Sequence, residues 1–238
     1  MSDINNTGER ILLEKETPLM IARHLSAYHF ASAYAKGKSV LEIGCGEGYG
    51  SYILSGVCNK ITAIDYNKEA ISYAKAKYER GNLYYTCLDI KELCELCDTY
   101  DLICCFQVIE HISQVDEFLK RTKSLLNKGG IFICSTPNKL DMSKGSHVPI
   151  NKFHVREYLF LEFKDLLSIH FSKVDIIGLK RSLQFNFYRR LKKIGLSRIL
   201  PHNMDPIRRF YFQGSTNSYF FDTRTIDKAL DFIAICKE

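Results

Sequence analysis

Apolar and polar positions along the chain follow two alternating periods. Short apolar runs that end at glycine or an acidic residue are typical of strands buried in a parallel sheet. Between them, apolar residues recur every three or four positions, which is typical of amphipathic helices. The expected strands are residues 39–44, 60–65, 83–88, 100–106 and the run that ends at 138. Strands that alternate with helices predict an α/β fold with a doubly wound parallel sheet.

The N-terminal flank predicts a helix before the first strand. Thr17 is a good N-cap residue, Pro18 fits a first helical turn, and Gly37 is a typical helix stop. We therefore expect residues 1–37 to form a helical arm on a core of residues 38–138.

The chain after the fifth strand departs from the alternating pattern. Residues 139–158 have no clear period and predict a lid loop over the site. Two more strands are expected near 173–177 and at 232–236, which brings the sheet to seven. Residues 180–230 then form an insertion before the last strand, far longer than a usual hairpin connection.

The first strand ends in a glycine-rich turn, Gly44-Cys45-Gly46-Glu47-Gly48. Because glycine has no β-carbon, backbone and ligand can approach each other closely there. A dinucleotide fingerprint anchored at Gly44 would require a small residue where the chain has Tyr49. A P-loop ending at Ser39 would require glycine where the chain has Ser32. The turn therefore favours a nucleotide-like ligand without a cradled pyrophosphate or triphosphate.

Two acidic residues accompany this turn. Glu42 lies inside the first strand, and Asp65 ends the second, 21 residues after Gly44. In nucleotide-binding α/β folds, an acid about 20 residues after the glycine turn binds ribose hydroxyls. A strand-end acid can also cap the helix that follows it, so Asp65 by itself leaves both roles open.

With these residues, the chain resembles the class I S-adenosylmethionine-dependent methyltransferases of the small-molecule group. Residues 83–90, 100–112 and 125–138 match further strands of that family in order, including the ending Val108-Ile109-Glu110-His111-Ile112. The resemblance implies one domain over residues 1–238, with a Rossmann-like, mostly parallel, seven-stranded sheet whose last strand is antiparallel. It also implies an enzyme with S-adenosyl-L-methionine as cofactor.

The same resemblance implies which residues hold the cofactor. Asp65 would bind the ribose. Asp89 would bind the adenine, with Ile90 packed on the adenine ring, although Asp89 could equally cap a short helix. Gln107 would meet the methionine amine through its backbone carbonyl. The expected set is Glu42, Gly44, Cys45, Gly46, Gly48, Tyr49, Asp65, Tyr66, Asp89, Ile90 and Gln107.

Candidate residues for the methyl acceptor lie after the fourth strand and in the loop. His111 could act as a base with a pKa suited to neutral pH, or only orient the acceptor. His147, His154 and Arg156 are expected substrate contacts. Residues 153–158 resemble a segment of methyltransferases associated with surface-polysaccharide pathways. We therefore expect an oxygen of a small or saccharide-like acceptor, with an RNA methyltransferase or a non-catalytic S-adenosylmethionine-binding protein as alternatives.

Composition sets bounds on the remaining questions. The 238 residues, 46% of them hydrophobic and 25% charged, suit one globular domain. The N-terminus has no apolar core of a signal peptide, and no run approaches the roughly 18 apolar residues of a membrane span, so a cytoplasmic location is expected. Nine cysteines fall largely in expected strands, as buried thiols. Cys94 and Cys97 lack a second pair, so no metal is expected.

Positive charge is concentrated in one segment. Residues 173–209 hold ten Lys or Arg and two Asp, whereas the whole chain has a net charge of +6. Within it, a helical pattern places Leu183, Phe187, Leu191 and Ile194 on one face and Arg189, Lys192 and Lys193 opposite. A solvated surface, an anionic substrate, an anionic membrane and nucleic acid all remain open, as does the oligomeric state.

Overall fold

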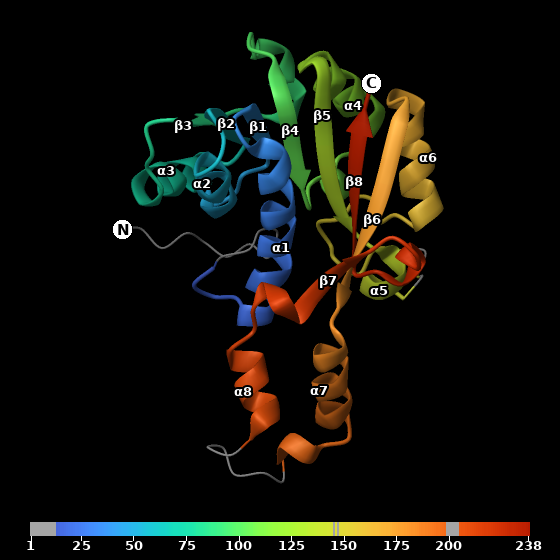
Figure 1. The fold of residues 1–238 in the computed structure, drawn as a ribbon. Helices are drawn as coiled ribbons and strands as arrows, with labels where there is room; N and C mark the ends of the chain where they lie inside the picture. The colour runs from blue at the N-terminus through green and yellow to red at the C-terminus, as the bar shows by residue number, and fades with distance from the viewer. Residues whose placement is uncertain (1–12, 145, 147, 199–204) are drawn as a thin grey trace.

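The computed structural model describes residues 13–144, 146, 148–198 and 205–238, and its centre is one eight-stranded sheet (Figure 1). The strand order is β3-β2-β1-β4-β5-β8-β6-β7. The strands are β1 Ser39–Ile43, β2 Lys60–Asp65, β3 Leu83–Cys87, β4 Tyr100–Phe106, β5 Leu126–Pro137, β6 Lys173–Arg181, β7 Tyr219–Asp222 and β8 Asp231–Lys237. The first five pair in parallel, and β8 is antiparallel to both β5 and β6. The Rossmann-like fold with its antiparallel last strand is confirmed.

The strand count differs from the seven expected. The additional strand is β7, which lies within the expected insertion and pairs antiparallel with β6 at the edge of the sheet. It has only four residues, of which Phe220 and Phe221 are exposed, so it carries neither a buried run nor a regular alternation. Such a short edge strand is held by its ladder to β6, which the local sequence does not reveal.

Eight α-helices of the described residues accompany the sheet. They are α1 Pro18–Ala35, α2 Tyr49–Ser55, α3 Lys68–Lys77, α4 Val115–Ser124, α5 Lys139–Met142, α6 Phe160–His170, α7 Leu183–Lys193 and α8 Pro206–Phe212. The hydroxyl of Thr17 accepts a hydrogen bond from the Met20 amide and Pro18 opens α1, as the sequence predicted. In the expected lid loop, α5 is a single turn and the remaining described residues are irregular.

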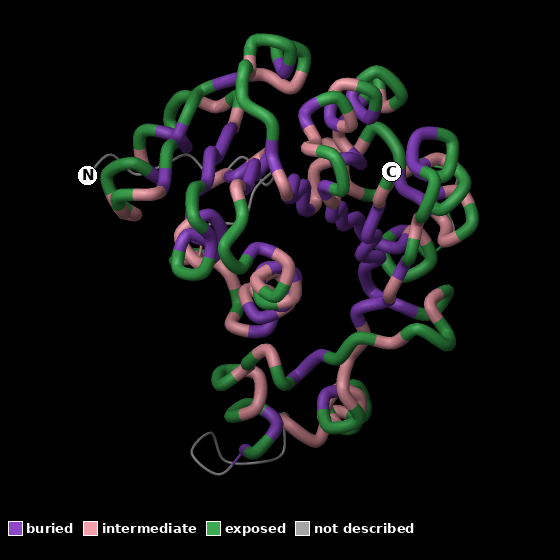
Figure 2. The backbone as a smooth tube through the Cα atoms, turned by 45° about the horizontal axis from the view of Figure 1, so that its top comes forward, coloured by how far each residue is buried: buried purple, intermediate pink, exposed green. Residues whose placement is uncertain are grey.

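In the central strands, neighbouring residues contribute to separate cores on the two faces of the sheet. Cys104 packs with α1, α2 and α3 on one face, and Cys105 packs with α4 and α6 on the other. Figure 2 shows the buried residues concentrated in the interior of the protein, with mostly exposed and intermediate residues around them. All nine cysteines lie in the described part of the chain and are free thiols, six of them buried. They act as small apolar side chains, as expected.

A buried ion pair fastens α1 to β8. The Arg23 guanidinium donates from Nε to Asp231 Oδ2 at 2.6 Å and from Nη2 to Asp231 Oδ1 at 2.5 Å. The two side chains are only 15% and 6% exposed. This two-pronged geometry fixes both partners strongly, and the pair joins residues that are 208 positions apart.

Helices α7 and α8 form an arm that extends away from the sheet (Figure 1). Because β5 and β6 are both antiparallel to β8, β6 runs in the same direction as β4 and β5. The arm therefore leaves the sheet at the edge where β1 and β4 also end. Phe185 anchors it in a small core with Leu19 and Tyr219. Among the described residues, no helix is both long and apolar enough to cross a membrane.

Candidate active site

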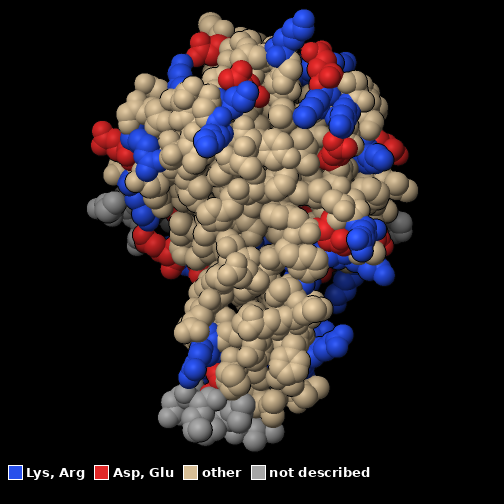
Figure 3. All heavy atoms as spheres, in the orientation of Figure 1, with Lys and Arg blue, Asp and Glu red and all other residues tan. Residues whose placement is uncertain are grey.

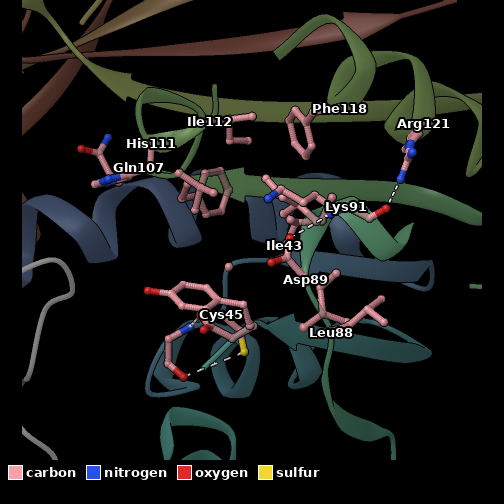
Figure 4. Close-up of a pocket in the computed structure, with 18 of the residues that line it drawn as sticks. Ile43, Cys45, Leu88, Asp89, Lys91, Gln107, His111, Ile112, Phe118 and Arg121 are labelled. Carbon is pink, nitrogen blue, oxygen red and sulfur yellow. Dashed lines mark hydrogen bonds between the residues drawn. The ribbon is translucent and has the colours of Figure 1, made fainter. Parts of the chain in front are cut away.

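A cavity of about 510 Å³ lies at the carboxyl ends of the parallel strands. It is formed by the loops after β1, β2, β3 and β4, with contributions from α1 and α4. Figure 4 shows Gln107 and His111 at one end, Arg121 at the other, and Asp89 and Lys91 between them. Its volume and position suit a small-molecule ligand of an open α/β sheet.

The glycine turn forms one wall of this cavity, and its residues have different reasons to be glycine. Gly44 has φ +78°, and a β-carbon there would lie 2.4 Å from Val108 Cγ2. Gly46 has φ +52° and lines the cavity, yet a β-carbon there would meet nothing within 4 Å. Gly44 therefore allows the turn to pass close to the β4 loop, whereas Gly46 leaves space that a ligand can use.

Gly48 and Gly50 serve packing instead. A β-carbon at Gly48, which has φ +84°, would lie 2.6 Å from the Tyr85 hydroxyl oxygen. At Gly50 it would lie 2.0 Å from the Tyr28 ring. Gly48 is not among the residues that line the cavity, so its expected contact with the cofactor stays a prediction.

Asp65 ties the glycine turn to the end of β2. Its Oδ2 accepts from the Gly46 amide and its Oδ1 from the Asn67 amide, each at 2.9 Å. The carboxylate lines the cavity as expected, and it also fixes the turn in which Gly46 lies. The Asp65 carboxylate thus lies where ribose hydroxyls could reach it, and its two hydrogen bonds restrict its orientation.

Asp89 caps a short helix and also lines the cavity, so its contact with the adenine stays a prediction. Its Oδ1 accepts from the Lys91 amide and caps the short 3₁₀ helix η1, Ile90–Glu95. It also lines the cavity next to Ile90. One carboxylate oxygen of Asp89, Oδ1, is therefore engaged by the cap.

Glu42 lies beneath the cavity and does not line it. Its carboxylate is buried and accepts from the Tyr28 hydroxyl at 2.7 Å and the Ser51 hydroxyl at 2.5 Å. Burial raises the pKa of Glu42 to about 7, against the lowering effect of these two hydrogen bonds. Since Tyr28 does line the cavity, Glu42 acts on the site through the tyrosine that it holds.

Gln107 follows β4 in a rarely occupied backbone conformation. Its φ of +56° is unusual for a residue with a side chain. The backbone amide donates to the Ser135 carbonyl at 3.0 Å, and the side-chain amide donates to the Ser135 hydroxyl at 3.2 Å. Backbone strain that the surroundings hold in place is common at ligand sites, and Gln107 lines this cavity.

His111 lies at the mouth of the cavity with its ring orientation fixed. Its Nδ1 lies 2.9 Å from the Phe153 carbonyl oxygen, which can only accept. Nδ1 therefore carries the proton, and Nε2 is the basic atom of the neutral ring. The His154 ring packs edge-on against His111 at 4.9 Å between centroids.

A buried carboxylate supports His154 in turn. His154 Nδ1 lies 3.0 Å from Glu157 Oε1, and both side chains are almost fully buried. The other Glu157 oxygen accepts from Ser143 in a short hydrogen bond. The loop that follows β5 thus reaches back and holds the ring that packs against His111.

The expected substrate contacts are placed only in part. Neither His154 nor the exposed Arg156, whose guanidinium lies over the Tyr158 ring at 5.1 Å, is among the residues that line the cavity. His147 lies outside the described residues. Their contact with an acceptor stays a prediction.

One group in the described residues could hold a metal ion. Glu110, His111 and His154 each bring a ligand atom within 4.8 Å of the others. All three side chains already have neighbours in the structure: Glu110 Oε2 accepts from Thr136 at 3.0 Å, and His154 Nε2 lies 3.0 Å from the Asn151 amide. His111 Nδ1 lies 2.9 Å from the Phe153 carbonyl oxygen. The cluster combines residues 110 and 111 with residue 154, which are more than 40 positions apart in the sequence. Their spacing therefore did not indicate a metal site.

Sequence reasoning missed the part of the cavity that α1 and α4 supply. His24 lines the cavity, and burial, followed by the nearby Arg23 charge, lowers its pKa to about 4, so it is neutral at pH 7. Glu47 and Ile112 also line the cavity; they lie within recognised motifs but were not expected as site residues. Other missed residues come from helix faces and loops outside those motifs, and they include Tyr28, Lys91, Ser113, Gln114, Glu117, Phe118 and Arg121.

Comparison with known proteins agrees with this geometry. A family model described as a methyltransferase domain matches residues 19–185. A protein of Mycolicibacterium smegmatis named "Probable S-adenosylmethionine-dependent methyltransferase" is 33% identical over 175 residues, 72% of this chain and 67% of that protein. A similarly named protein of Mycobacterium tuberculosis is 32% identical over 162 residues, 68% of this chain but only 58% of that protein.

Solved structures agree on the fold. A methyltransferase of Archaeoglobus fulgidus superposes with a TM-score of 0.62 at 20% identity and covers 91% of this chain and 94% of that chain. The plantazolicin methyltransferase BpumL, solved with S-adenosylhomocysteine, has a TM-score of 0.59 at 22% identity and covers 94% of this chain and 86% of that chain. The chain thus belongs to the class I S-adenosylmethionine-dependent methyltransferases, enzymes whose cofactor is S-adenosyl-L-methionine. The open space at Gly46 and the acids at the ends of β2 and β3 fit that cofactor.

Proposed function

We propose that this protein transfers a methyl group from S-adenosylmethionine to an oxygen of a small or saccharide-like acceptor. The observation that carries the proposal is the fixed ring of His111 at the cavity mouth, with Nε2 as its basic atom. A hydroxyl nucleophile benefits from a base that removes its proton, whereas an amine needs little such help. A ubiquinone biosynthesis O-methyltransferase of Coxiella burnetii, 33% identical over 106 residues, supports an oxygen acceptor.

The proposed roles of the residues follow from their positions. Gly46 leaves room for the cofactor, and Asp65 and Asp89 accept hydrogen bonds from its ribose and adenine. When bound, S-adenosylmethionine would supply a methyl group on a positively charged sulfur, which is a good leaving group because it departs as a neutral thioether. His111 takes the acceptor proton on Nε2, and the carbonyl of Phe153 keeps its ring aligned. Alignment of the reacting groups provides most of the rate enhancement in such a displacement.

The first experiment separates cofactor binding from transfer. Isothermal titration with S-adenosylmethionine and S-adenosylhomocysteine should show binding of both. A labelled methyl donor should then label an acceptor with free hydroxyls among sugar nucleotides and phenols. Labelling of RNA alone, or cofactor binding with no transfer to any acceptor, would reject the proposal in favour of one of the two alternatives.

Replacement of His111 tests the base. His111→Gln keeps a side chain that can hydrogen-bond but removes the basic nitrogen, so we expect kcat to fall by roughly 10²–10⁴ while cofactor affinity stays unchanged. His29→Gln, on the exposed side of α1, is the matched control. A kcat within about twofold of the wild type would limit His111 to an orienting role.

Treatment with a chelator tests the expectation that no metal takes part. We expect EDTA to leave the rate of methyl transfer unchanged. If activity fell and returned with Mg²⁺, Mn²⁺ or Zn²⁺, the cluster of Glu110, His111 and His154 would be a metal site, and His111 could not act as the base.

A further inference from the structure

The exposed face of α7 is unusually apolar. Leu183, Phe187 and Ile194 are 89%, 57% and 76% exposed, and we call them the α7 stripe. The helical period brings all three to one face, as the sequence predicted. A surface helix usually turns such a face toward the core, but here the core-facing residue of the helix is Phe185.

The opposite side of α7 is already occupied. Tyr188 stacks on Phe210 of α8 at 4.8 Å between ring centroids, and Phe185 packs edge-on against Tyr211. The Lys192 ammonium lies 4.1 Å from the centre of the Tyr211 ring. The α7 stripe is therefore left outside the contacts that hold the arm together, and Figure 2 shows the arm largely as intermediate and exposed residues.

Basic side chains border the stripe. Arg190 is three residues from Phe187 and four from Ile194, so it is a neighbour of both on the helix surface. Lys193, one turn after Arg190, lies at the boundary between the stripe and the opposite face on which the sequence pattern placed it. Both are exposed, and α7 contains no acidic residue. Figure 3 shows the arm below the body of the protein with Lys and Arg along its sides. An apolar strip bordered by cations is the pattern of a helix that lies in the headgroup region of an anionic bilayer.

Other partners fit these residues less well. A second copy of the same face would bring Arg190 and Lys193 against like charges, which is unfavourable. RNA would use the cations but gives no favourable contact to the aliphatic Leu183 and Ile194. A bilayer surface accommodates both features, because the apolar side chains enter the acyl boundary while the cations meet lipid phosphates.

The arm also has a meaningful position relative to the cavity. It extends from the edge of the sheet at which β1, β2 and β4 end, and this edge carries the cavity. A membrane bound by the arm would therefore lie on the side of the molecule to which methyl transfer is assigned.

We propose that the α7 stripe docks the protein on an anionic lipid bilayer as a peripheral contact. The docked enzyme draws its acceptor from that surface, so the acceptor combines a hydroxyl-bearing head with a lipid tail. This second part rests on the proposed methyl transfer, whereas the docking itself does not.

Vesicle sedimentation tests the docking. The full chain should sediment with vesicles of phosphatidylglycerol and phosphatidylcholine, and much less with pure phosphatidylcholine. The variant Leu183→Ser/Phe187→Ser/Ile194→Ser should lose at least about tenfold in the vesicle partition coefficient. Ile169→Ser on α6, which removes a side chain that is 74% exposed, is the matched control and should bind as the wild type does.

A second variant tests the charges. Arg190→Glu/Lys193→Glu should lose binding to the anionic vesicles, and added salt should weaken the wild-type interaction in the same direction. Circular dichroism should be unchanged for all variants, because every replaced side chain is exposed. Absence of wild-type binding to anionic vesicles, or equal binding by the triple-serine variant, would overturn the proposal.

Two further outcomes would also overturn it. If light scattering showed a wild-type dimer that the triple-serine variant converts to a monomer, the stripe would be covered by a second copy. If the stripe supported RNA binding instead of vesicle binding, the partner would be nucleic acid.

Cofactor titration and activity measurements distinguish a failure of the docking proposal from a failure of the proposed methyl transfer. The triple-serine variant should bind S-adenosylhomocysteine as the wild type does, and it should methylate a short-chain soluble acceptor at the wild-type rate. Its rate on the same head group embedded in vesicles should fall with the loss of docking. Docking without transfer to any acceptor would reject the methyl transfer and leave the docking in place.

Discussion

Two helices of this protein begin directly after a strand, yet they use their apolar residues differently. Helix α2 follows the glycine turn after β1 and buries Leu54 and Tyr49 against the sheet. Helix α7 follows β6 and buries only Phe185, while Leu183 and Phe187 face solvent. The comparison shows that a helix after a strand buries its apolar residues where other elements cover that face, as in α2. The amphipathic pattern of α7 predicted the helix but did not identify a partner for its apolar face.

The largest expected effect concerns the ion pair that links α1 to the sheet. Asp231→Ala should destabilise the protein by about 3–5 kcal/mol, because it leaves the buried Arg23 charge without its partner. Asp98→Ala, which breaks the exposed pair with Lys60, should cost less than about 1 kcal/mol. Urea unfolding of both variants measures the difference. Equal losses would show that α1 is held by its apolar contacts alone.

The contrast within α7 itself gives the next largest effect. Phe185→Ala should cost about 3 kcal/mol, because Phe185 fills the small core at the base of the arm. Phe187→Ala, two residues away on the exposed face, should change the stability by no more than about 0.5 kcal/mol. Thermal unfolding followed by circular dichroism compares the two. A large loss for Phe187→Ala would mean that the stripe is covered within the protein itself.

On the cofactor side, the strand-end acids should decide affinity. Asp65→Ala should weaken S-adenosylhomocysteine binding by about 1–3 kcal/mol through lost hydrogen bonds to the ribose, as measured by isothermal titration. Asp89→Ser sharpens the second assignment, because serine retains the cap of η1 but removes the carboxylate from the cavity.

The Asp89→Ser variant should therefore unfold like the wild type but bind the cofactor more weakly. If affinity stayed the same, Asp89 would be only a helix cap. Unchanged affinity for Asp65→Ala would likewise remove the ribose assignment.

The last expected effect is visible only in the pH dependence of stability and comes from Glu42, which lies beneath the cavity. Burial raises the pKa of Glu42 from its usual 4.5 to about 7. Between these values the folded protein keeps a proton that the unfolded chain has lost, so this carboxyl lowers stability as pH rises through that window. Above pH 7 both states are ionised and the contribution stays constant.

Glu42→Gln should remove this loss. Between pH 4.5 and 7, the free energy of unfolding of the variant should fall by about 1–3 kcal/mol less than that of the wild type. Glu95→Gln, an exposed substitution, should leave the profile unchanged. Denaturant titrations at several pH values measure both slopes. If the free energy of unfolding changed with pH in Glu42→Gln as it does in the wild type, the Glu42 carboxyl of the folded protein would be ionised over the whole range from pH 4.5 to 7.

The sequence by itself determined the half of the cavity that the strand ends form. In a parallel sheet the strand ends share one edge, so the order of strands and the positions of Gly46, Asp65 and Asp89 were enough to bring them to one cavity. The backbone hydrogen bonds between the strands fix the spacing of the strand ends, and side-chain substitutions have little influence on that spacing. For the same reason Gly44 and Gly46 could be recognised from their spacing.

Only the tertiary structure decided which residues from distant segments complete the site. Glu42 does not line the cavity and accepts a hydrogen bond from Tyr28, which does, while His24 and Arg121 reach the cavity from helices without a motif. Strand β7, the ring of His154 behind His111, and the outward face of α7 also depend on contacts between segments far apart in the chain. Local periodicity specifies the conformation of a segment, but burial is decided by what packs against it, and that information is not local.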